Sequence, residues 1–171
     1  MAENLDYVVE GSKCYNNDPS NCDTYGRLYN WATAMGFESS CNYNSCSSQI
    51  NSPHRGICPS GWHIPNDDDW NVLMDYVGGS STAGRYLKAT SGWYNNGNGT
   101  DEYGFSALPG GGDHSGSIFE IVAANGYWWS TSEYEDNSDY AYYRYMNYGY
   151  EYAGWVSDFK SNLLSVRCLQ D

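Results

Sequence analysis

The six cysteines constrain the fold of this chain more than any other sequence feature. An even number of cysteines in an acidic, polar chain is typical of an oxidising compartment, where cysteines form disulfides. Two pairs lie close in sequence, and each would close a short polar loop. The last pair would then tie the middle of the chain to its end, a closure that contributes roughly 4–5 kcal/mol by loop entropy. We therefore predict three disulfides: Cys14–Cys22, Cys41–Cys46 and Cys58–Cys168.

Zinc binding is the alternative use of these cysteines. It is less favoured, because no C-x-x-C pair occurs and the three histidines are scattered along the chain.

Length and charge limit the function classes that are open to the chain. Its 171 residues suit a single domain, which we expect to span residues 1–171. The 8 Lys and Arg against 21 Asp and Glu give a net charge of −13, which disfavours nucleic acid and anionic lipid surfaces as partners. Neutral glycans, cations and basic protein surfaces remain open. No apolar stretch approaches the ~20 residues of a membrane span, so we expect no membrane insertion.

The residue composition is typical of a recognition surface. The chain has 18 Tyr, 7 Trp and 19 Gly, with Asn and Ser filling much of the remainder. Such surfaces combine rigid amphipathic rings with small hydrogen-bonding residues. The alternative is a Tyr-rich β-domain with many half-exposed strands.

Apolar spacing predicts two main helices. Asp23 or Thr24 would begin the first helix and Gly36 would end it. Its apolar stripe is Leu28, Trp31, Ala32 and Met35. The second helix begins at about Asn66, has acidic residues in its first turn, and stops at a pair of glycines. Its stripe is Trp70, Leu73, Met74 and Val77.

Strands dominate the second half of the chain. A shorter helix is expected over 82–88, and residues 41–54 are expected to form a loop held by its own disulfide. Gly, Asn and Asp separate strand-like runs. The predicted strands cover residues 103–108, 117–122, 127–132, 140–148, 152–156 and 163–169. This order predicts an α+β fold whose small sheet closes with the N-terminal part.

Five motifs follow one another along the chain: YGRLYNWA (25–32), CPSGWHIP (58–65), GFSALPGG (104–111), WWSTSE (128–133) and SVRC (165–168). In this order they resemble the Fibrobacter succinogenes major paralogous domain. More distantly, the helix opening at 64–70 and the SVRC segment resemble formylglycine-generating-enzyme-like proteins. The resemblance implies a C-type-lectin-like fold, with two main helices flanking a small twisted antiparallel sheet. It also implies a secreted protein or one on the outer surface of a bacterium.

Enzyme chemistry is the weakest of the functional hypotheses. Formylglycine-generating enzymes use reactive cysteines that bind a metal, whereas Cys168 is expected to pair with Cys58. No motif links the histidines to a nucleophile, and His63 is expected to be a packed core residue. We therefore expect no catalytic residues.

One flexible loop has a weak calcium signature. Oxygen-bearing residues alternate with Gly and Asp, which would let the loop curl round a hard cation. The candidate ligands are Asn96, Asn98, Thr100 and Glu102. The alternative, an ordinary solvated Asn-Gly turn, is favoured. The acidic residues at 133, 135, 136 and 139 are a second place to look for a metal.

The most distinctive segment is Tyr-rich and covers residues 133–158. If Met146 faces inward, strand alternation turns Tyr143 and Tyr145 outward. In the next strand, Ala153 and Trp155 suit the core. Pairing of the two strands would then produce one outward patch of rings edged by polar groups.

We predict that this patch binds a glycan or a protein. The predicted ligand-binding residues are Tyr134, Tyr143, Tyr145, Asn147, Tyr150, Tyr152, Val156 and Asp158. The alternative is a structural adhesin or matrix module without a soluble ligand, in which a ladder of tyrosines stabilises an exposed sheet. The sequence leaves the oligomeric state open.

Overall fold

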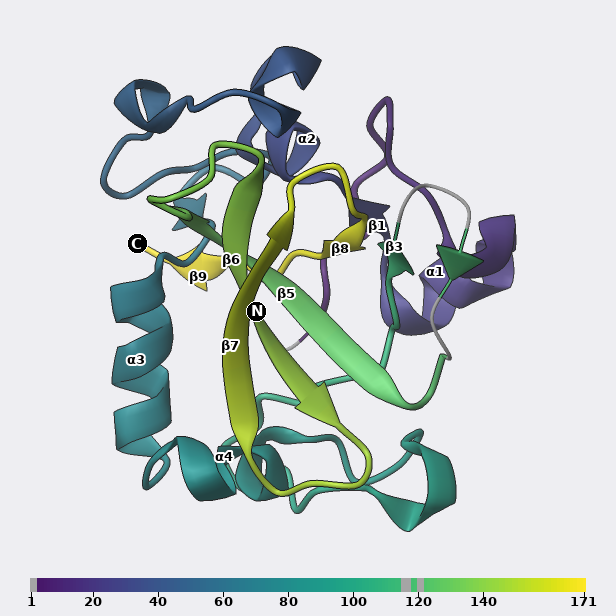
Figure 1. The fold of residues 1–171 in the computed structure, drawn as a ribbon. Coiled ribbons are helices and arrows are strands. Elements are labelled where there is room, and N and C mark those ends of the chain that lie inside the picture. Colours follow the sequence, from purple (N-terminus) through teal and green to yellow (C-terminus); the bar gives the residue numbers. More distant parts are fainter. Residues whose placement is uncertain (1–2, 115–117, 120–121) are drawn as a thin grey trace.

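The computed structural model describes residues 3–114, 118–119 and 122–171 (Figure 1). Its centre is a five-stranded sheet in the order β1-β8-β5-β6-β7. The strands are β1 (Leu28–Tyr29), β8 (Leu164–Ser165), β5 (Asn125–Glu133), β6 (Tyr140–Asn147) and β7 (Ala153–Phe159). β1 pairs with β8, so the predicted closure of the sheet by the N-terminal part is confirmed. β5 and β8 run parallel, so the sheet is mixed, whereas a wholly antiparallel sheet was predicted.

Two short ribbons complete the β-structure of the described residues. β2 (Trp62–His63) pairs with β9 (Leu169–Gln170), and β3 (Asp113–His114) pairs with β4 (Ile118–Phe119). The strand predicted over 117–122 thus contains β4 but falls partly outside the described residues. The strand predicted over 163–169 is divided into β8 and β9.

The strand predicted over residues 103–108 is wrong. This segment is irregular, because the Asp101 carboxylate accepts hydrogen bonds from both the N–H and the hydroxyl of Ser106, at 2.6 and 2.5 Å. An Asp side chain that captures a backbone N–H in this way competes with a sheet ladder.

Among the helices, the two predicted after residue 65 are confirmed. The helices are α1 (Pro19–Tyr25), α2 (Trp31–Met35), α3 (Asp67–Tyr76) and α4 (Ser80–Leu87), with short 3₁₀ turns η1 (Tyr15–Asn17), η2 (Ser39–Asn42), η3 (Ser47–Gln49) and η4 (Tyr94–Asn96). α3 begins with a reciprocal capping box between Asn66 and Asp69.

The first predicted helix is wrong, since three elements, α1, β1 and α2, occupy its range and its apolar stripe is divided between β1 and α2. Gly26 ends α1 with φ +76°, where an added Cβ would lie 2.8 Å from Asn4. Leu28 then enters β1, and the Asn30 side chain caps α2 through the Thr33 N–H at 2.8 Å. Gly36 ends α2 in the left-handed conformation, as expected from its position.

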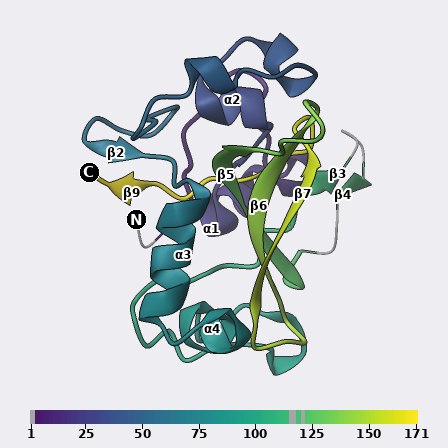
Figure 2. The same ribbon diagram turned by 60° about the vertical axis from the view of Figure 1, so that its left-hand side comes forward.

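The sheet is covered on both faces (Figures 1 and 2). α3 and α4 lie against one face, where a first core cluster packs Trp70, Met74 and Leu87 with Trp128 and Met146. The second core cluster, on the other face, includes residues of α2, the disulfide loops and the SVRC segment. Side chains on either face of the central strands can therefore be buried, as Trp128 and Trp129 are on successive positions of β5.

All three predicted disulfides are present: Cys14–Cys22, Cys41–Cys46 and Cys58–Cys168. Cys41, Cys46, Cys58 and Cys168 belong to the second core cluster, so two of the bridges also fill the interior. Within the described ranges, no helix is both long enough and apolar enough to cross a membrane.

Candidate functional site

The two C-terminal Tyr-rich strands pair as expected. β6 and β7 are antiparallel, with Tyr143 opposite Val156 and Tyr145 opposite Gly154. Met146 and Ala153 are buried against the α3 and α4 face, which confirms their predicted orientation.

For two other residues the predicted alternation holds but the predicted exposure is wrong. Tyr143 is only 8 % exposed, because β6 lies inside the sheet and the second core cluster covers the face of β6 that carries Tyr143. The Tyr143 ring packs on Tyr127 and Trp129. Trp155 was expected in the core, yet 57 % of it is exposed. β7 is the last strand of the sheet, and the Trp155 ring lies at that margin against Tyr142.

Four of the predicted residues form what we call the tyrosine patch: Tyr145, Tyr150, Tyr152 and Val156. The hydroxyls of Tyr145 and Tyr152 are 3.2 Å apart, and the rings of Tyr150 and Tyr152 are 5.1 Å apart. The Tyr145–Tyr152 hydrogen bond, followed by burial, raises the pKa of Tyr145 to about 12. Tyr150 and Val156 are exposed, and the other two rings are half-buried.

Gly154 makes room for the patch. It lies opposite Tyr145 in the ladder, and a Cβ at position 154 would come within 2.3 Å of the tyrosine ring. The ring of Tyr145 therefore lies over the β7 backbone, beside Tyr152.

A buried lysine positions the turn that carries Tyr150. Lys88, at the end of α4, donates to the carbonyls of Asn147 and Tyr150 at 3.1 and 2.9 Å, and lies over the Trp93 ring. Burial lowers the pKa of Lys88. The Asn147 side chain accepts from the Gly149 N–H at 2.7 Å. Asn147 thus shapes the turn itself, and sequence reasoning missed Lys88.

Two predicted site residues lie apart from the tyrosine patch. Asp158 is half-buried and 3.4 Å from His114. Burial alone would raise the pKa of Asp158, but hydrogen bonds from His114 and the Phe159 N–H lower it overall. Tyr134 packs on Tyr142, which belongs to the opposite face of the β6–β7 pair.

On that opposite face lies a second set of rings, which we call the aromatic row: Tyr134, Tyr140, Tyr142, Trp155 and Phe159. Successive ring centroids are 5.4 Å apart for Trp155–Tyr142, 5.6 Å for Tyr142–Tyr134, 6.4 Å for Tyr134–Tyr140 and 4.6 Å for Tyr140–Phe159. Phe159 is 47 % exposed. The row begins at Trp155 on the edge strand, reaches Tyr134 just after β5, and returns to the edge strand at Phe159. Sequence reasoning missed it because it assigned Trp155 to the core.

The loop proposed for calcium uses its residues in packing. Asn98 accepts the Trp93 N–H at 3.0 Å, and Thr100 contacts the Arg85 carbonyl at 3.4 Å. A Cβ at Gly97 or Gly99 would lie within 2.5 Å of a neighbouring carbonyl. No group of three His, Cys, Asp or Glu suited to a metal occurs among the residues described. Asn96 and Glu102 are exposed, and calcium binding at this loop stays a prediction.

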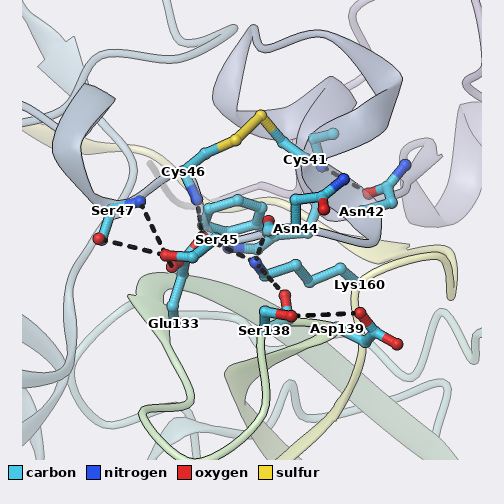
Figure 3. A network of polar contacts seen from close by, with 12 residues as sticks. Cys41, Asn42, Asn44, Ser45, Cys46, Ser47, Glu133, Ser138, Asp139 and Lys160 are labelled. Carbon is cyan, nitrogen blue, oxygen red and sulfur yellow. Dashed lines mark hydrogen bonds and ion pairs between the residues drawn. A yellow bond between two sulfur atoms is a disulfide. The ribbon is translucent and has the colours of Figure 1, made fainter.

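The acidic cluster proposed as a second metal site contains a buried ion pair (Figure 3). Lys160 is fully buried and donates to Glu133 at 2.7 Å and to the carbonyls of Asn44 and Ser138. Burial alone would raise the pKa of Glu133, but hydrogen bonds from Lys160, Ser45 and the Cys46 N–H lower it overall. This carboxylate therefore joins the disulfide loop to the sheet.

The cysteines and histidines are engaged in separate parts of the structure. All six cysteines are in disulfides. His54 contacts the Met35 carbonyl at 2.9 Å, and His63 contacts Asp171 at 2.7 Å. His63 is buried, as predicted.

Comparison with known proteins identifies one family. No curated protein and no solved structure matches the chain. The family model described as the Fibrobacter succinogenes major domain matches residues 1–170, so the chain belongs to that family.

Proposed function

We propose that this protein is an extracellular recognition domain that binds a glycan or a protein ligand through the tyrosine patch. The observation that carries the proposal is the grouping of Tyr145, Tyr150 and Tyr152 on one side of β6 and β7, with ring contacts of 5.1 and 5.9 Å. Lys88 holds the connecting turn, so the rings are positioned before a ligand arrives. Preorganised aromatic anchors lose little entropy on binding.

The chemistry of the patch suits sugars or a protein surface. Phenol faces stack on the C–H groups of pyranose rings, and the hydroxyl pair of Tyr145 and Tyr152 can exchange hydrogen bonds with a polar ligand. The C-type-lectin-like fold is part of this proposal, and it is supported by the pairing of β1 with β8 near the two ends of the chain.

A secreted or outer-surface location is also part of the proposal, and the three disulfides support it. A formylglycine-generating type of enzyme would need a free thiol, and the pairing of every cysteine argues against that type of enzyme.

Glycan-array and pull-down binding with the double variant Tyr150→Ala/Tyr152→Ala tests the proposal. We expect ligand binding to fall at least about tenfold, as for the loss of an aromatic anchor. Tyr76→Ala is the matched control, because Tyr76 is 73 % exposed at the far end of α3. Unchanged binding by the double variant would remove the patch as the binding site.

One observation favours the alternative of a structural adhesin or matrix module. β7 ends the sheet, and an edge strand can pair with a second copy of the chain. That role predicts concentration-dependent self-association in sedimentation experiments and no soluble ligand.

A further inference from the structure

Among the residues that the structure describes, β7 pairs with β6 on one side and has no strand on its outer side. Lys160 N–H donates to the Asp139 carbonyl at 2.8 Å, and the adjacent pair in the register is Tyr140 with Phe159. Antiparallel ladders alternate bonded and non-bonded pairs, so the backbone groups of Trp155 and Ser157 point away from β6. The Phe159 N–H agrees with this alternation, since it bonds to the Asp158 side chain at 2.7 Å.

β7 has few of the features that usually protect an edge strand, and its one charged residue, Asp158, lies 3.4 Å from His114. The strand spans Ala153–Phe159 and contains no Lys and no Pro, and its register with β6 has no irregularity. Natural edge strands are shortened, charged, kinked or covered to prevent pairing. The edge of β7 is therefore suited to accept one more strand.

Beside this edge, three acidic residues lie near Tyr142 of the aromatic row. Burial and the neighbouring Tyr134 contribute most to raising the pKa of Tyr142. The negative charges of Asp67, Glu135 and Asp136 raise this pKa further. Glu135 and Asp136 are exposed next to the row.

The protein surface as a whole is even more acidic than the composition indicates. The structure describes all eight basic residues, and four of them are buried. The buried ones are Lys88, Arg144, Lys160 and Arg167. A second copy with net charge −13 would be repelled from this edge, whereas a basic segment would be attracted.

We propose that β7 and the aromatic row form a docking site for an extended, basic segment of another protein. The segment adds to β7 as a sixth strand of the sheet. Its backbone pairs with the outward groups of Trp155 and Ser157, and alternate Lys or Arg side chains lie over the rings. This site is on the face opposite the tyrosine patch, and it holds whether or not that patch binds a ligand.

Titration of the full, disulfide-bonded chain with a synthetic peptide of alternating Lys and Thr tests the proposal. Calorimetry measures the affinity, and a peptide of alternating Glu and Thr is the charge control. The double variant Trp155→Ala/Phe159→Ala keeps the net charge and should weaken binding at least about tenfold. If this variant and the wild type bound the Lys/Thr peptide with equal affinity, the proposed site would be overturned, because the net charge of the protein alone would then attract the peptide.

A second pair of variants tests the backbone edge. Ser157→Pro removes an outward N–H, and Ser157→Lys adds a like charge beside the incoming strand; both should weaken peptide binding. Ser157→Lys keeps the test decisive if the proline variant does not fold. Binding unchanged in the lysine variant would overturn strand addition.

Two controls distinguish peptide docking on β7 from binding at the tyrosine patch and from self-association. Tyr150→Ala/Tyr152→Ala should leave peptide affinity unchanged, and a loss there would place the peptide on the tyrosine patch. Self-association at micromolar concentration, abolished by Ser157→Lys, would instead assign the edge to a second copy of the chain and overturn the proposal.

Discussion

Replacement of Lys160 by Met tests whether the buried ion pair stabilises the fold. Lys160 is fully buried, and its ammonium group donates to three oxygens, from Glu133, Asn44 and Ser138 (Figure 3). It also lies 4.5 Å from the centre of the Trp31 ring. Met matches much of the volume of the lysine but supplies no proton donor.

The expected cost follows from what the substitution leaves behind. Glu133 keeps hydrogen bonds from the Ser45 hydroxyl and the Cys46 N–H, at 2.7 and 2.8 Å, but loses its cation. Removing one partner of a buried pair typically costs about 3–5 kcal/mol, because the other charge stays buried. We expect the free energy of unfolding to fall by this amount. The double variant Lys160→Met/Glu133→Gln should lose less than the sum of the two single variants.

Urea unfolding followed by tryptophan fluorescence, with the disulfides intact, measures this loss. Arg85→Met is the control, since it removes an exposed positive charge and should change the unfolding free energy by less than about 0.5 kcal/mol. A loss below about 1 kcal/mol for Lys160→Met would refute the reasoning, because such a value is typical of a solvent-exposed pair.

Three further predictions follow from the same geometry. The folded-state pKa of Glu133 lies below its ordinary value of about 4.3, so the ionised carboxylate stabilises the fold fully above that pH. This stabilisation is lost as the pH falls through the lowered pKa. The variant Glu133→Gln should therefore show a smaller loss of unfolding free energy at acid pH than the wild type. Lys88→Met leaves the Tyr150 carbonyl without its donor, and faster amide exchange in the β6–β7 turn should follow; unchanged exchange would contradict the role of Lys88. Gly154→Ala places a methyl group against the Tyr145 ring and should lower both stability and ligand binding, whereas unchanged ring chemical shifts would contradict the contact.

Local chemistry made several elements readable from the sequence alone. The short cysteine spacings left one pairing for Cys58 and Cys168, and the capping residues marked the start of α3 at Asn66. These features depend on neighbours in the chain, so no knowledge of the fold is needed to interpret them. The pairing of β6 with β7 was readable for the same reason, since the two strands are joined by a short turn.

The three-dimensional arrangement alone decided which faces of those strands are exposed. Alternation along β6 orders its side chains, but the second core cluster covers the face of β6 at Tyr143, so this ring is buried. Trp155 is exposed because β7 ends the sheet, and strand order depends on contacts between distant segments. Lys88 and Lys160 would be read as surface charges, and only the carbonyls gathered by folding make their burial possible. The sequence by itself thus determined the disulfide frame and most of the elements. Tertiary packing determined which of the aromatic rings are exposed, because exposure depends on neighbours far away in the chain.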